Sequence, residues 1–211
     1  MKISIVDYGL GNLFSLANAI GLFENDLLVT DDLNRLRESD VLVLPGVGAF
    51  GDGMNRLQSL DIDHVLVDHA SKDKPILGVC LGMQLLLESS HEFGYHKGLG
   101  IIEGSVKHFR EFSGFDNMSK VPHVGWNKIQ SMSSSAGLKT INHQDMYFAH
   151  SLCALTTNPQ ATIATACYGN IRFAAAIQEG SILGCQFHPE KSAASGLSFL
   201  QQFMECSKAK L

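Results

Sequence analysis

The chain has 211 residues, of which 45% are hydrophobic and 18% charged, so it can bury a substantial core and is not expected to be disordered. A formal net charge of -5, with 16 Lys and Arg residues thinly spread, argues against nucleic acid as the main partner. No apolar run approaches the roughly 18 residues of a membrane span, and the N-terminus lacks a signal-peptide pattern. Residues 1–211 are therefore expected to form a single cytoplasmic domain with no membrane contact.

Five cysteines are scattered along the chain, and none forms a C-x-x-C pair. An odd, scattered set argues against a secreted disulfide framework and against a zinc site. Most of these cysteines are expected to be reduced and buried as small hydrophobic residues. Neither a metal nor a cofactor is predicted.

Short apolar runs alternate with helical patterns over the first half of the chain. The run at 3–6 predicts a strand, and apolar residues at helical spacing over 13–23 predict a helix that Asn12 is placed to cap. Continuous apolar runs at 41–44 and 76–79 are typical of strands buried in a parallel sheet. The other predicted elements here are a strand at 27–29 and helices at 33–37, 54–70 and 81–88. Repeated strand–helix units predict a doubly wound parallel sheet.

Strand-like segments predominate from about residue 100 onward. The expected strands are 101–109, 124–129, 146–150, 161–168, 171–178 and 182–187, followed by a helix over 194–204. The predicted fold is therefore α/β, with a mixed, mostly parallel central sheet, helices on both of its faces, and extra antiparallel strands in the second half.

The most informative local motif is Gly78-Val79-Cys80-Leu81-Gly82, at the junction of an apolar strand and an amphipathic helix. Glycines two residues on either side of a nucleophile are what a strained strand–turn–helix elbow needs. The helix N-terminus would favour the Cys80 thiolate, and the Leu81 amide would point at a developing oxyanion. The alternative is that Cys80 is a buried small residue, but the flanking glycines favour a nucleophile.

A thiolate nucleophile needs a base, and the base needs a group that orients it. Phe187-His188-Pro189-Glu190 follows the last strand and offers both, because strand ends on one sheet converge in space. The other histidines are weaker candidates. Five lie in polar surroundings and are expected to be solvated, namely His64, His69, His91, His96 and His108. Three have no carboxylate at a rigid offset, namely His123, His143 and His150.

A competing motif is Gly46-Val47-Gly48-Ala49-Phe50-Gly51, which matches the G-x-G-x-x-G fingerprint of dinucleotide-binding domains. Pro45 precedes it and disrupts the usual tight turn between strand and helix. A second version, at Gly9 and Gly11, lacks the third glycine. We therefore interpret residues 45–48 as a mobile loop whose amides could line an oxyanion hole, with nucleotide binding as the alternative.

Taken together, these residues resemble the class I (triad) glutamine amidotransferases, through Gly-x-Cys-x-Gly-x-Gln at 78–84 and His-Pro-Glu at 188–190. More narrowly, four further motifs resemble the glutaminase subunits of imidazole glycerol phosphate synthases. They are Asp7-Tyr8-Gly9-x-Gly11-Asn12, Leu44-Pro45-Gly46-Val47-Gly48-Ala49-Phe50, Val124-Gly125-Trp126-Asn127 and Tyr147-Phe148-x-His150-Ser151. The resemblance runs from Ile3 to about Leu200 and implies the amidotransferase fold.

The resemblance also implies a set of site residues. Cys80 would attack the side-chain amide of glutamine, His188 would pass the proton to the leaving ammonia, and Glu190 would orient His188. The oxyanion would be held by the amide of Leu81 and by that of Val47 or Gly48. Glutamine would be bound by Gln84, Glu92 and the Ser151-Leu152 main chain. Leu152 stands where the family more often has an aromatic residue, and the alternative for Glu92 is a solvated loop acid.

A partner is implied as well. In this family the ammonia goes to a (β/α)₈-barrel cyclase, which makes imidazole glycerol phosphate and aminoimidazole carboxamide ribonucleotide. The residues that match the family's contact and hinge positions are Asn12, Trp126, Asn127, Tyr147 and Lys191. A partly buried core position is the alternative for Trp126. The resemblance further implies weak glutaminase activity without the partner and acceptor, until the loop at 45–48 reorganises.

Two alternatives to this function stay open from the sequence alone. The chain could keep the fold as a non-catalytic scaffold subunit, although the complete Cys-His-Glu set argues against this. It could also keep the chemistry but serve another acceptor, because paralogues resembling this subunit serve the amidation of surface-polysaccharide sugars.

Overall fold

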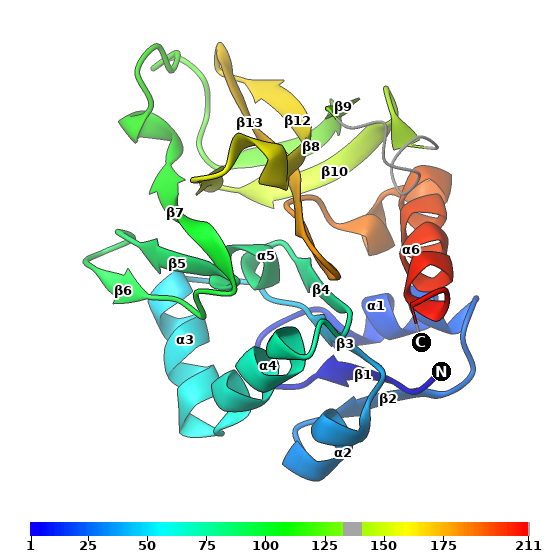
Figure 1. Cartoon of the computed structure of the whole chain (residues 1–211). Coiled ribbons are helices and arrows are strands. Elements are labelled where there is room, and N and C mark those ends of the chain that lie inside the picture. The colour runs from blue at the N-terminus through cyan, green and yellow to red at the C-terminus, as the bar shows by residue number, and fades with distance from the viewer. Residues whose placement is uncertain (133–140, 211) are drawn as a thin grey trace.

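The computed structural model describes residues 1–132 and 141–210 (Figure 1). Its central sheet contains five parallel strands, which come from both ends of the chain. They are β1 (Ile3–Val6), β2 (Leu27–Thr30), β3 (Val41–Leu44), β4 (Ile76–Val79) and β14 (Ile182–Cys185), in the spatial order β2-β1-β3-β4-β14. The predicted parallel sheet is therefore confirmed.

The sheet continues from β14 through antiparallel strands of the second half. These are β13 (Ile171–Glu179), β12 (Thr162–Tyr168) and β9 (Gln130–Ser131), which complete an eight-stranded sheet. A two-stranded ribbon pairs β8 (His123–Lys128) with β10 (Asp145–His150). A four-stranded sheet has the order β11-β7-β5-β6, with bounds Leu152–Thr156, Ile102–His108, Leu87–Ser90 and His96–Lys97. The extra antiparallel strands predicted for the second half are thus present.

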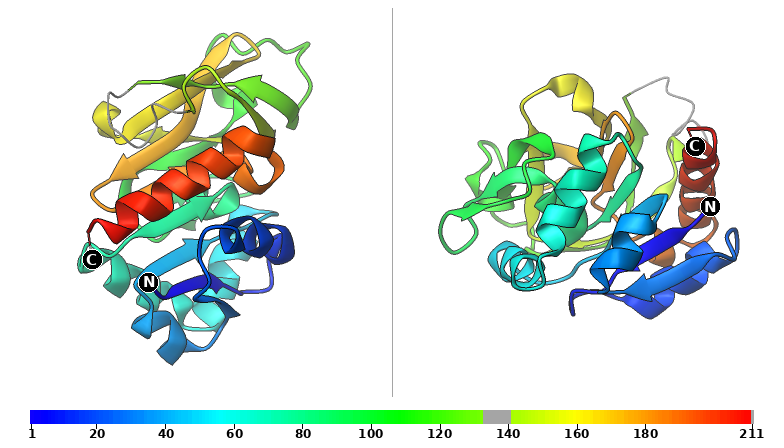
Figure 2. Two further views of the ribbon diagram at one scale, coloured as in Figure 1. Left: turned by 90° about the vertical axis from the view of Figure 1, so that its right-hand side faces the viewer. Right: turned by 60° about the horizontal axis from the view of Figure 1, so that its bottom comes forward.

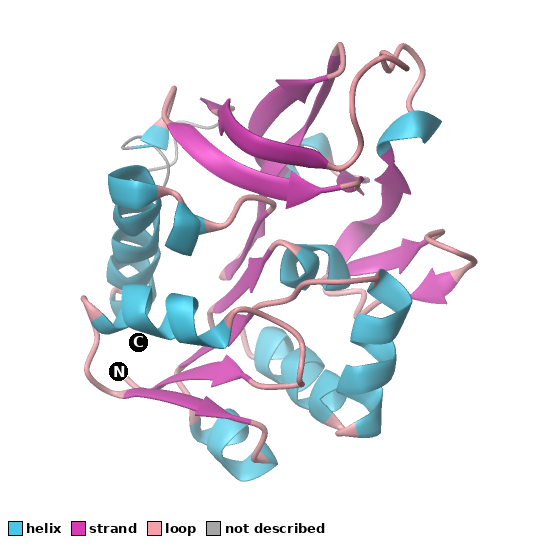
Figure 3. Cartoon of the chain, turned by 180° about the vertical axis from the view of Figure 1, so that it is seen from behind, coloured by secondary structure: helices cyan, strands magenta, loops and turns pink. Residues whose placement is uncertain are grey.

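Helices cover both faces of the central sheet (Figure 3). On one face, α1 (Leu13–Gly21) contacts α6 (Ala193–Lys208), and the two lie side by side in Figure 2. On the other face lie α2 (Leu33–Glu38), α3 (Phe50–Ser59) and α4 (Ile62–Ser71). The short α5 (Leu81–Leu85) follows β4, and single 3₁₀ turns occupy η1 (Phe109–Glu111), η3 (Pro159–Ala161) and η4 (Pro189–Lys191).

Two hydrophobic cores lie on opposite faces of the parallel strands, because successive side chains of a strand point to opposite faces. In β3, Val41 and Val43 join the core under α1 and α6, whereas Leu42 and Leu44 join the core under α2, α3 and α4. A strand that is covered on both faces, such as β3, therefore needs apolar residues at successive positions. This requirement explains the unbroken apolar runs in the sequence.

The predicted helices differ from the structure by a few residues at their ends, and two of them differ further for a clear physical reason. The helix expected over 54–70 is two helices, because Asp61 adopts a left-handed conformation (φ 56°) that separates α3 from α4. The helix expected over 81–88 ends at Leu85, because the chain from Leu87 pairs with β7 instead. Pairing with β7 outweighs the helical spacing of the segment from Leu87. The short strands β5, β6, β9 and β11 were not predicted from the sequence.

The parallel arrangement sets where chemistry can occur. β3, β4 and β14 are neighbours, so the segments that follow them leave the sheet at one edge. Those segments are the loop at 45–48, the turn at Cys80, and the stretch that leads to His188. Residues far apart in the chain are thereby brought together.

No helix among the described residues is both long and apolar enough to cross a membrane.

Candidate active site

Cys80 occupies a strained turn between β4 and α5. Its backbone angles are φ 55° and ψ −108°, a combination rare for a residue with a side chain. The Cys80 amide donates a hydrogen bond to the carbonyl of Cys185 at 2.8 Å, which ties the turn to β14. The thiol is buried among the side chains at the sheet edge, with the helix N-terminus directly behind it. This is the elbow that the sequence predicts.

The glycines of the motif are required by close backbone contacts. A Cβ on Gly82 would overlap the carbonyl oxygen of Leu44, the last residue of β3. A Cβ on Gly78 would lie 2.8 Å from the carbonyl oxygen of Gly82 and from the amide nitrogen of Met83. The turn can therefore pack against β3 only when residue 82 lacks a side chain, and the first turn of α5 can pack over β4 only when residue 78 lacks one.

His188 and Glu190 form a buried pair on the η4 turn. Their atoms Nδ1 and Oε1 lie 3.0 Å apart, and both side chains are almost completely buried. Burial by itself would lower the pKa of His188, but hydrogen bonds and charges from Cys80 and Glu190 outweigh it and raise this pKa to about 9. The protonated form of His188 is thus favoured near neutral pH.

The main chain holds this histidine firmly. The amide of His188 donates to the carbonyl of Tyr147 at 2.8 Å. The hydroxyl of Ser192 donates to the carbonyl of His188 at 2.6 Å and accepts from the amide of Tyr147 at 2.9 Å. Because Tyr147 belongs to β10, the ribbon fixes the position of the ring.

Cys80 and His188 line one cavity of about 320 Å³. Most of the other predicted site residues line it too, namely Val47, Gly48, Leu81, Gln84, Glu92, Ser151, Leu152 and Lys191. Glu190 is not in the lining and contacts His188 Nδ1 instead. Three further lining residues, Pro122, Ala149 and His150, were not among the predicted site residues. The cavity can hold a small amino acid next to the thiol.

The side chains of Gln84 and Glu92 are held by specific partners. Gln84 Nε2 donates to Gln186 Oε1 at 3.0 Å and to the carbonyl of Leu152 at 3.4 Å. Glu92 Oε2 accepts from the amide of Phe50 at 2.6 Å, at the N-terminus of α3. The alternative of a solvated loop acid for Glu92 is therefore wrong, since a helix N-terminus stabilises its carboxylate.

The loop at 45–48 lies beside the elbow. The Tyr8 hydroxyl donates to the carbonyl of Pro45 at 2.7 Å, and Gly46 fits closely between Tyr8 and Leu81. Burial, with a smaller contribution from the charge of Cys80, raises the pKa of Tyr8 well above its usual range, so this hydroxyl stays a donor. By contrast, Val47 is exposed, and a Cβ on Gly48 (φ +105°) would meet no atom. The loop is thus anchored at its start and open at its tip.

Gln186 is a site residue that the sequence reasoning missed. Its Nε2 donates to the sulfur of Cys80 at 3.7 Å, and its Oε1 accepts from Gln84. Gln186 lies two residues before His188, so period-2 spacing could have placed both on one face of the chain.

The predictions for the other histidines and the cysteines are partly wrong. His69, expected to be solvated, is buried, with Nε2 at 3.3 Å from the carbonyl of Pro75, and burial lowers its pKa to about 4. His123 and His150 are also buried. Three cysteines are buried as expected, whereas Cys167 and Cys206 are exposed. No group of three His, Cys, Asp or Glu residues among those described is placed to hold a metal ion.

Four of the predicted contact residues lie on the ribbon and on η4, whereas Asn12 lies at the start of α1. Trp126 is 55% exposed, so a core role for it is wrong. Its ring lies 6.1 Å from that of Tyr147, over which Lys191 Nζ sits at 5.9 Å. Asn127 turns inward, and its Nδ2 donates to the carbonyl of Cys167 at 2.8 Å. Asn12 caps α1 as predicted, accepting from the amide of Ser15 at 3.4 Å.

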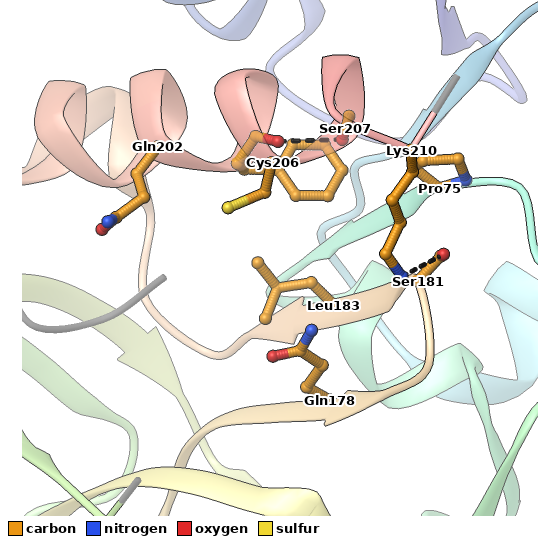
Figure 4. Close-up of a pocket in the computed structure, with 9 residues that line it drawn as sticks. Pro75, Gln178, Ser181, Leu183, Gln202, Cys206, Ser207 and Lys210 are labelled. Atoms are coloured by element: carbon orange, nitrogen blue, oxygen red, sulfur yellow. Dashed lines mark hydrogen bonds between the residues drawn. The ribbon is translucent and has the colours of Figure 1, made fainter. Parts of the chain in front are cut away.

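A second hollow, of about 50 Å³, lies between α6 and the ends of β13 and β14 (Figure 4). Its lining includes Pro75 and Ser181, which precede β4 and β14, so it lies at the opposite edge of the sheet from Cys80. Lys210 Nζ donates to Ser181 Oγ at 2.6 Å, and Ser207 Oγ donates to the carbonyl of Phe203 at 2.8 Å (Figure 4). This hollow is small and contains none of the predicted site residues.

Comparison with known proteins shows the family of this chain. Residues 5–206 match the model of the family "Glutamine amidotransferase class-I". The chain belongs to this family. Among solved structures, this amidotransferase is similar to one described as a glutamine amidotransferase (TM-score 0.75, 13% identity, covering 99% of this chain and 100% of that one). It is also similar to a glutamine amidotransferase from Thermotoga maritima (TM-score 0.62, 15% identity, covering 100% of this chain and 85% of that one). The predicted amidotransferase-like fold is thus confirmed.

Curated relatives are similar over the full length of this amidotransferase. The chain is 41% identical to imidazole glycerol phosphate synthase subunit HisH 1 of Legionella pneumophila (strain Lens), covering 97% of this chain and 99% of the relative. It is 41% identical to imidazole glycerol phosphate synthase subunit HisH of Sulfurimonas denitrificans, covering 99% of this chain and 100% of the relative. It is 35% identical to the HisH subunit of Geobacillus sp., covering 99% of this chain and 98% of the relative. Within the amidotransferases, the chain therefore belongs with the HisH subunits.

Proposed function

We propose that this chain is the glutaminase subunit of an imidazole glycerol phosphate synthase, which hydrolyses glutamine and passes the ammonia to a cyclase subunit. One observation carries the proposal for the site: Cys80 and His188 share a cavity of about 320 Å³ with the residues predicted to bind glutamine. The identity of 35–41% to HisH subunits over nearly the full chain supports the acceptor pathway.

In the first half of the reaction, the Cys80 thiolate attacks the carboxamide carbon of glutamine and a C–S bond forms. The negative charge moves to the amide oxygen, where the main-chain amide of Leu81 and one from the loop at Val47 or Gly48 stabilise it. Protonated His188 gives its proton to the amide nitrogen as the C–N bond breaks. Ammonia leaves, and a γ-glutamyl thioester remains on Cys80.

In the second half, water attacks the thioester, and His188 accepts the proton of that water. The C–S bond breaks, and glutamate and the Cys80 thiolate are released, so the net reaction converts glutamine and water to glutamate and ammonia. Glu190 Oε1 accepts a hydrogen bond from His188 Nδ1 throughout, which orients the ring and stabilises its charged form. Gln84, Glu92 and the main chain of Ser151 and Leu152 hold the amino-acid part of the substrate.

The partner would be a (β/α)₈-barrel cyclase, joined with this chain as a cytoplasmic heterodimer. Ammonia would pass to it through the interface and be incorporated into imidazole glycerol phosphate and aminoimidazole carboxamide ribonucleotide in histidine biosynthesis. The exposed Trp126, with Tyr147 and Lys191 beside it, supports an interface near the cavity, because Trp is enriched in interface hot spots. Asn12 and Asn127 are the other residues that match the family's contact and hinge positions. The open tip of the loop at 45–48 is consistent with a rearrangement when the partner binds.

The substitution Cys80→Ala tests the proposal. In the chain mixed with its cyclase partner, we expect this variant to lose glutamine hydrolysis while ammonia-dependent synthesis continues. Cys206→Ala is the matched control, because Cys206 is exposed on α6, and this variant should keep both activities. Glutamate release and imidazole glycerol phosphate formation would be measured side by side.

The possible outcomes separate the candidate functions. Glutamine hydrolysis that persists in Cys80→Ala would contradict the assigned nucleophile. A wild-type chain that is neither active nor labelled at Cys80 by a glutamine-analogue electrophile would indicate a scaffold subunit. Glutaminase activity without any stimulation by the cyclase and its nucleotide substrate would point to another acceptor, such as a sugar.

A further inference from the structure

Two buried histidines, His123 and His150, lie in contact with each other, and the proposed reaction does not use them. They are register partners on the ribbon, opposite each other on β8 and β10. His123 Nδ1 lies 3.1 Å from His150 Nε2. The His123 ring stacks on Tyr168 at 4.1 Å and on Phe148 at 5.1 Å, so the pair sits in an aromatic surrounding. Burial lowers the pKa of His123 to about 4 and that of His150 to about 3, and both rings are therefore neutral at neutral pH.

The hydrogen-bond partners determine which nitrogen of each ring carries its proton. His150 Nδ1 lies 2.7 Å from the carbonyl oxygen of Leu152, which can only accept, so Nδ1 is the donor. His150 Nε2 is then an acceptor, and His123 Nδ1 must donate to it. His123 Nε2 is left as an acceptor, and Asn127 Nδ2 lies 3.4 Å from it. Every donor in this series of hydrogen bonds thus points in the direction from Asn127 to Leu152.

This series of hydrogen bonds ends at the carbonyl of Leu152, which belongs to the main chain proposed to bind glutamine. The Leu152 carbonyl accepts from His150 and also, at 3.4 Å, from Gln84 Nε2. Gln84 bonds Gln186 in turn, and Gln186 donates to the sulfur of Cys80. A continuous hydrogen-bonded path therefore runs from the ribbon that carries Trp126 to the thiol. His150 also lines the cavity itself.

We propose that His150 is a positioning residue for glutamine, which holds the Ser151–Leu152 main chain in the orientation that binds the substrate, and that His123 locks His150 in the required tautomer. This inference rests on the proposed function. A neutral histidine held in one tautomer suits this role. His150 can orient the Leu152 carbonyl without bringing a charge next to the Cys80 thiolate and the His188 cation. The bond is intramolecular and present before substrate binds, so it would act on affinity for glutamine.

The test uses the full chain with its cyclase partner and measures KM and kcat for glutamine. His150→Leu removes the donor and should raise KM about five- to tenfold with a smaller change in kcat, as the loss of one hydrogen bond predicts. His150→Asn keeps an N–H near the position of Nδ1 and should restore most of the affinity. His123→Phe keeps the stacked ring but not its donor, and it should give a smaller rise in KM.

His69→Leu is the matched control, because His69 is equally buried, bonds a single carbonyl, and lies on α4. It should lower stability without changing KM. An unchanged KM in both His150→Leu and His123→Phe, or His150→Asn no better than His150→Leu, would overturn the inference. If His150→Leu does not fold, the KM of the other two variants still decides. A wild-type chain without glutaminase activity or Cys80 labelling would instead refute the proposed function, and the inference with it.

Discussion

The substitution Glu190→Gln removes the charge that faces His188 but keeps the size of the side chain. In the wild type, Oε1 of Glu190 accepts from His188 Nδ1 at 3.0 Å in a site closed to solvent. An amide in its place can still accept through its oxygen, but it offers no negative charge to the imidazolium. The protonated form of His188 should therefore be less stable in the variant, while the fold is retained.

The magnitude follows from the pKa of His188. The difference between an ordinary value of 6.5 and about 9 corresponds to about 3 kcal/mol in favour of the charged form. Cys80 and Glu190 share in this effect against the opposing effect of burial. A hydrogen bond to a charged group contributes about 1.5–3 kcal/mol, so Glu190→Gln should lower the pKa of His188 to about 7–8.

The same difference predicts how stability depends on pH. Because the folded-state pKa of His188 is raised above its unfolded value of 6.5, its contribution is fully present below pH 6.5 and is lost as the pH rises toward about 9. In Glu190→Gln the loss should be smaller and complete at a lower pH. NMR titration of the His188 ring gives the pKa directly, and urea denaturation at pH 6, 7.5 and 9 gives the free energy of unfolding.

Glu103→Gln is the control for this experiment, because Glu103 is an exposed residue of β7. It should change neither the pKa of His188 nor the pH dependence of unfolding. An unaltered His188 titration in Glu190→Gln would refute the assignment of Glu190 as the group that stabilises the cation.

Two further predictions concern the elbow and the exposed tryptophan. Gly82→Ala forces a methyl group against the carbonyl of Leu44, and we expect a loss of at least about 2 kcal/mol in the free energy of unfolding, measured with urea, together with loss of glutaminase activity. Gly21→Ala in α1 has open space around it, should not destabilise the chain, and serves as the control. Trp126→Ala should weaken binding to the cyclase by about 2 kcal/mol in calorimetric titration and leave the unfolding midpoint unchanged, since the ring is 55% exposed. Normal stability in Gly82→Ala, or normal partner affinity in Trp126→Ala, would contradict these two arguments.

Much of the fold could be predicted because buried parallel strands leave a strong local signal. The apolar runs at 3–6, 41–44 and 76–79 are all observed strands, and the cap at Asn12 is where the sequence places it. Predictions were wrong where a local pattern competed with long-range pairing. The segment from Leu87 has helical spacing, yet it joins β7 as a strand.

The site could be predicted where its residues belong to short sequence motifs. Gly-x-Cys-x-Gly and His-Pro-Glu each specify a local geometry, and the order of the strands then brings Cys80 and His188 into one cavity. Gln186 and the pair of His123 and His150 carry no such motif. Their roles depend on which atoms each ring or amide contacts in the folded chain, and residue spacing along the sequence does not contain that information.

By itself, the sequence determined the strained elbow, the elements that bear the nucleophile and its base, and the family. These are local properties, set by glycine spacing, apolar runs and capping residues within about ten positions. Only the tertiary structure decided which carbonyl each buried histidine faces, that the Glu92 carboxylate binds the start of α3, and that Trp126 is exposed. Hydrogen bonds between strands are set by register and burial, and these arise only when distant segments pack together.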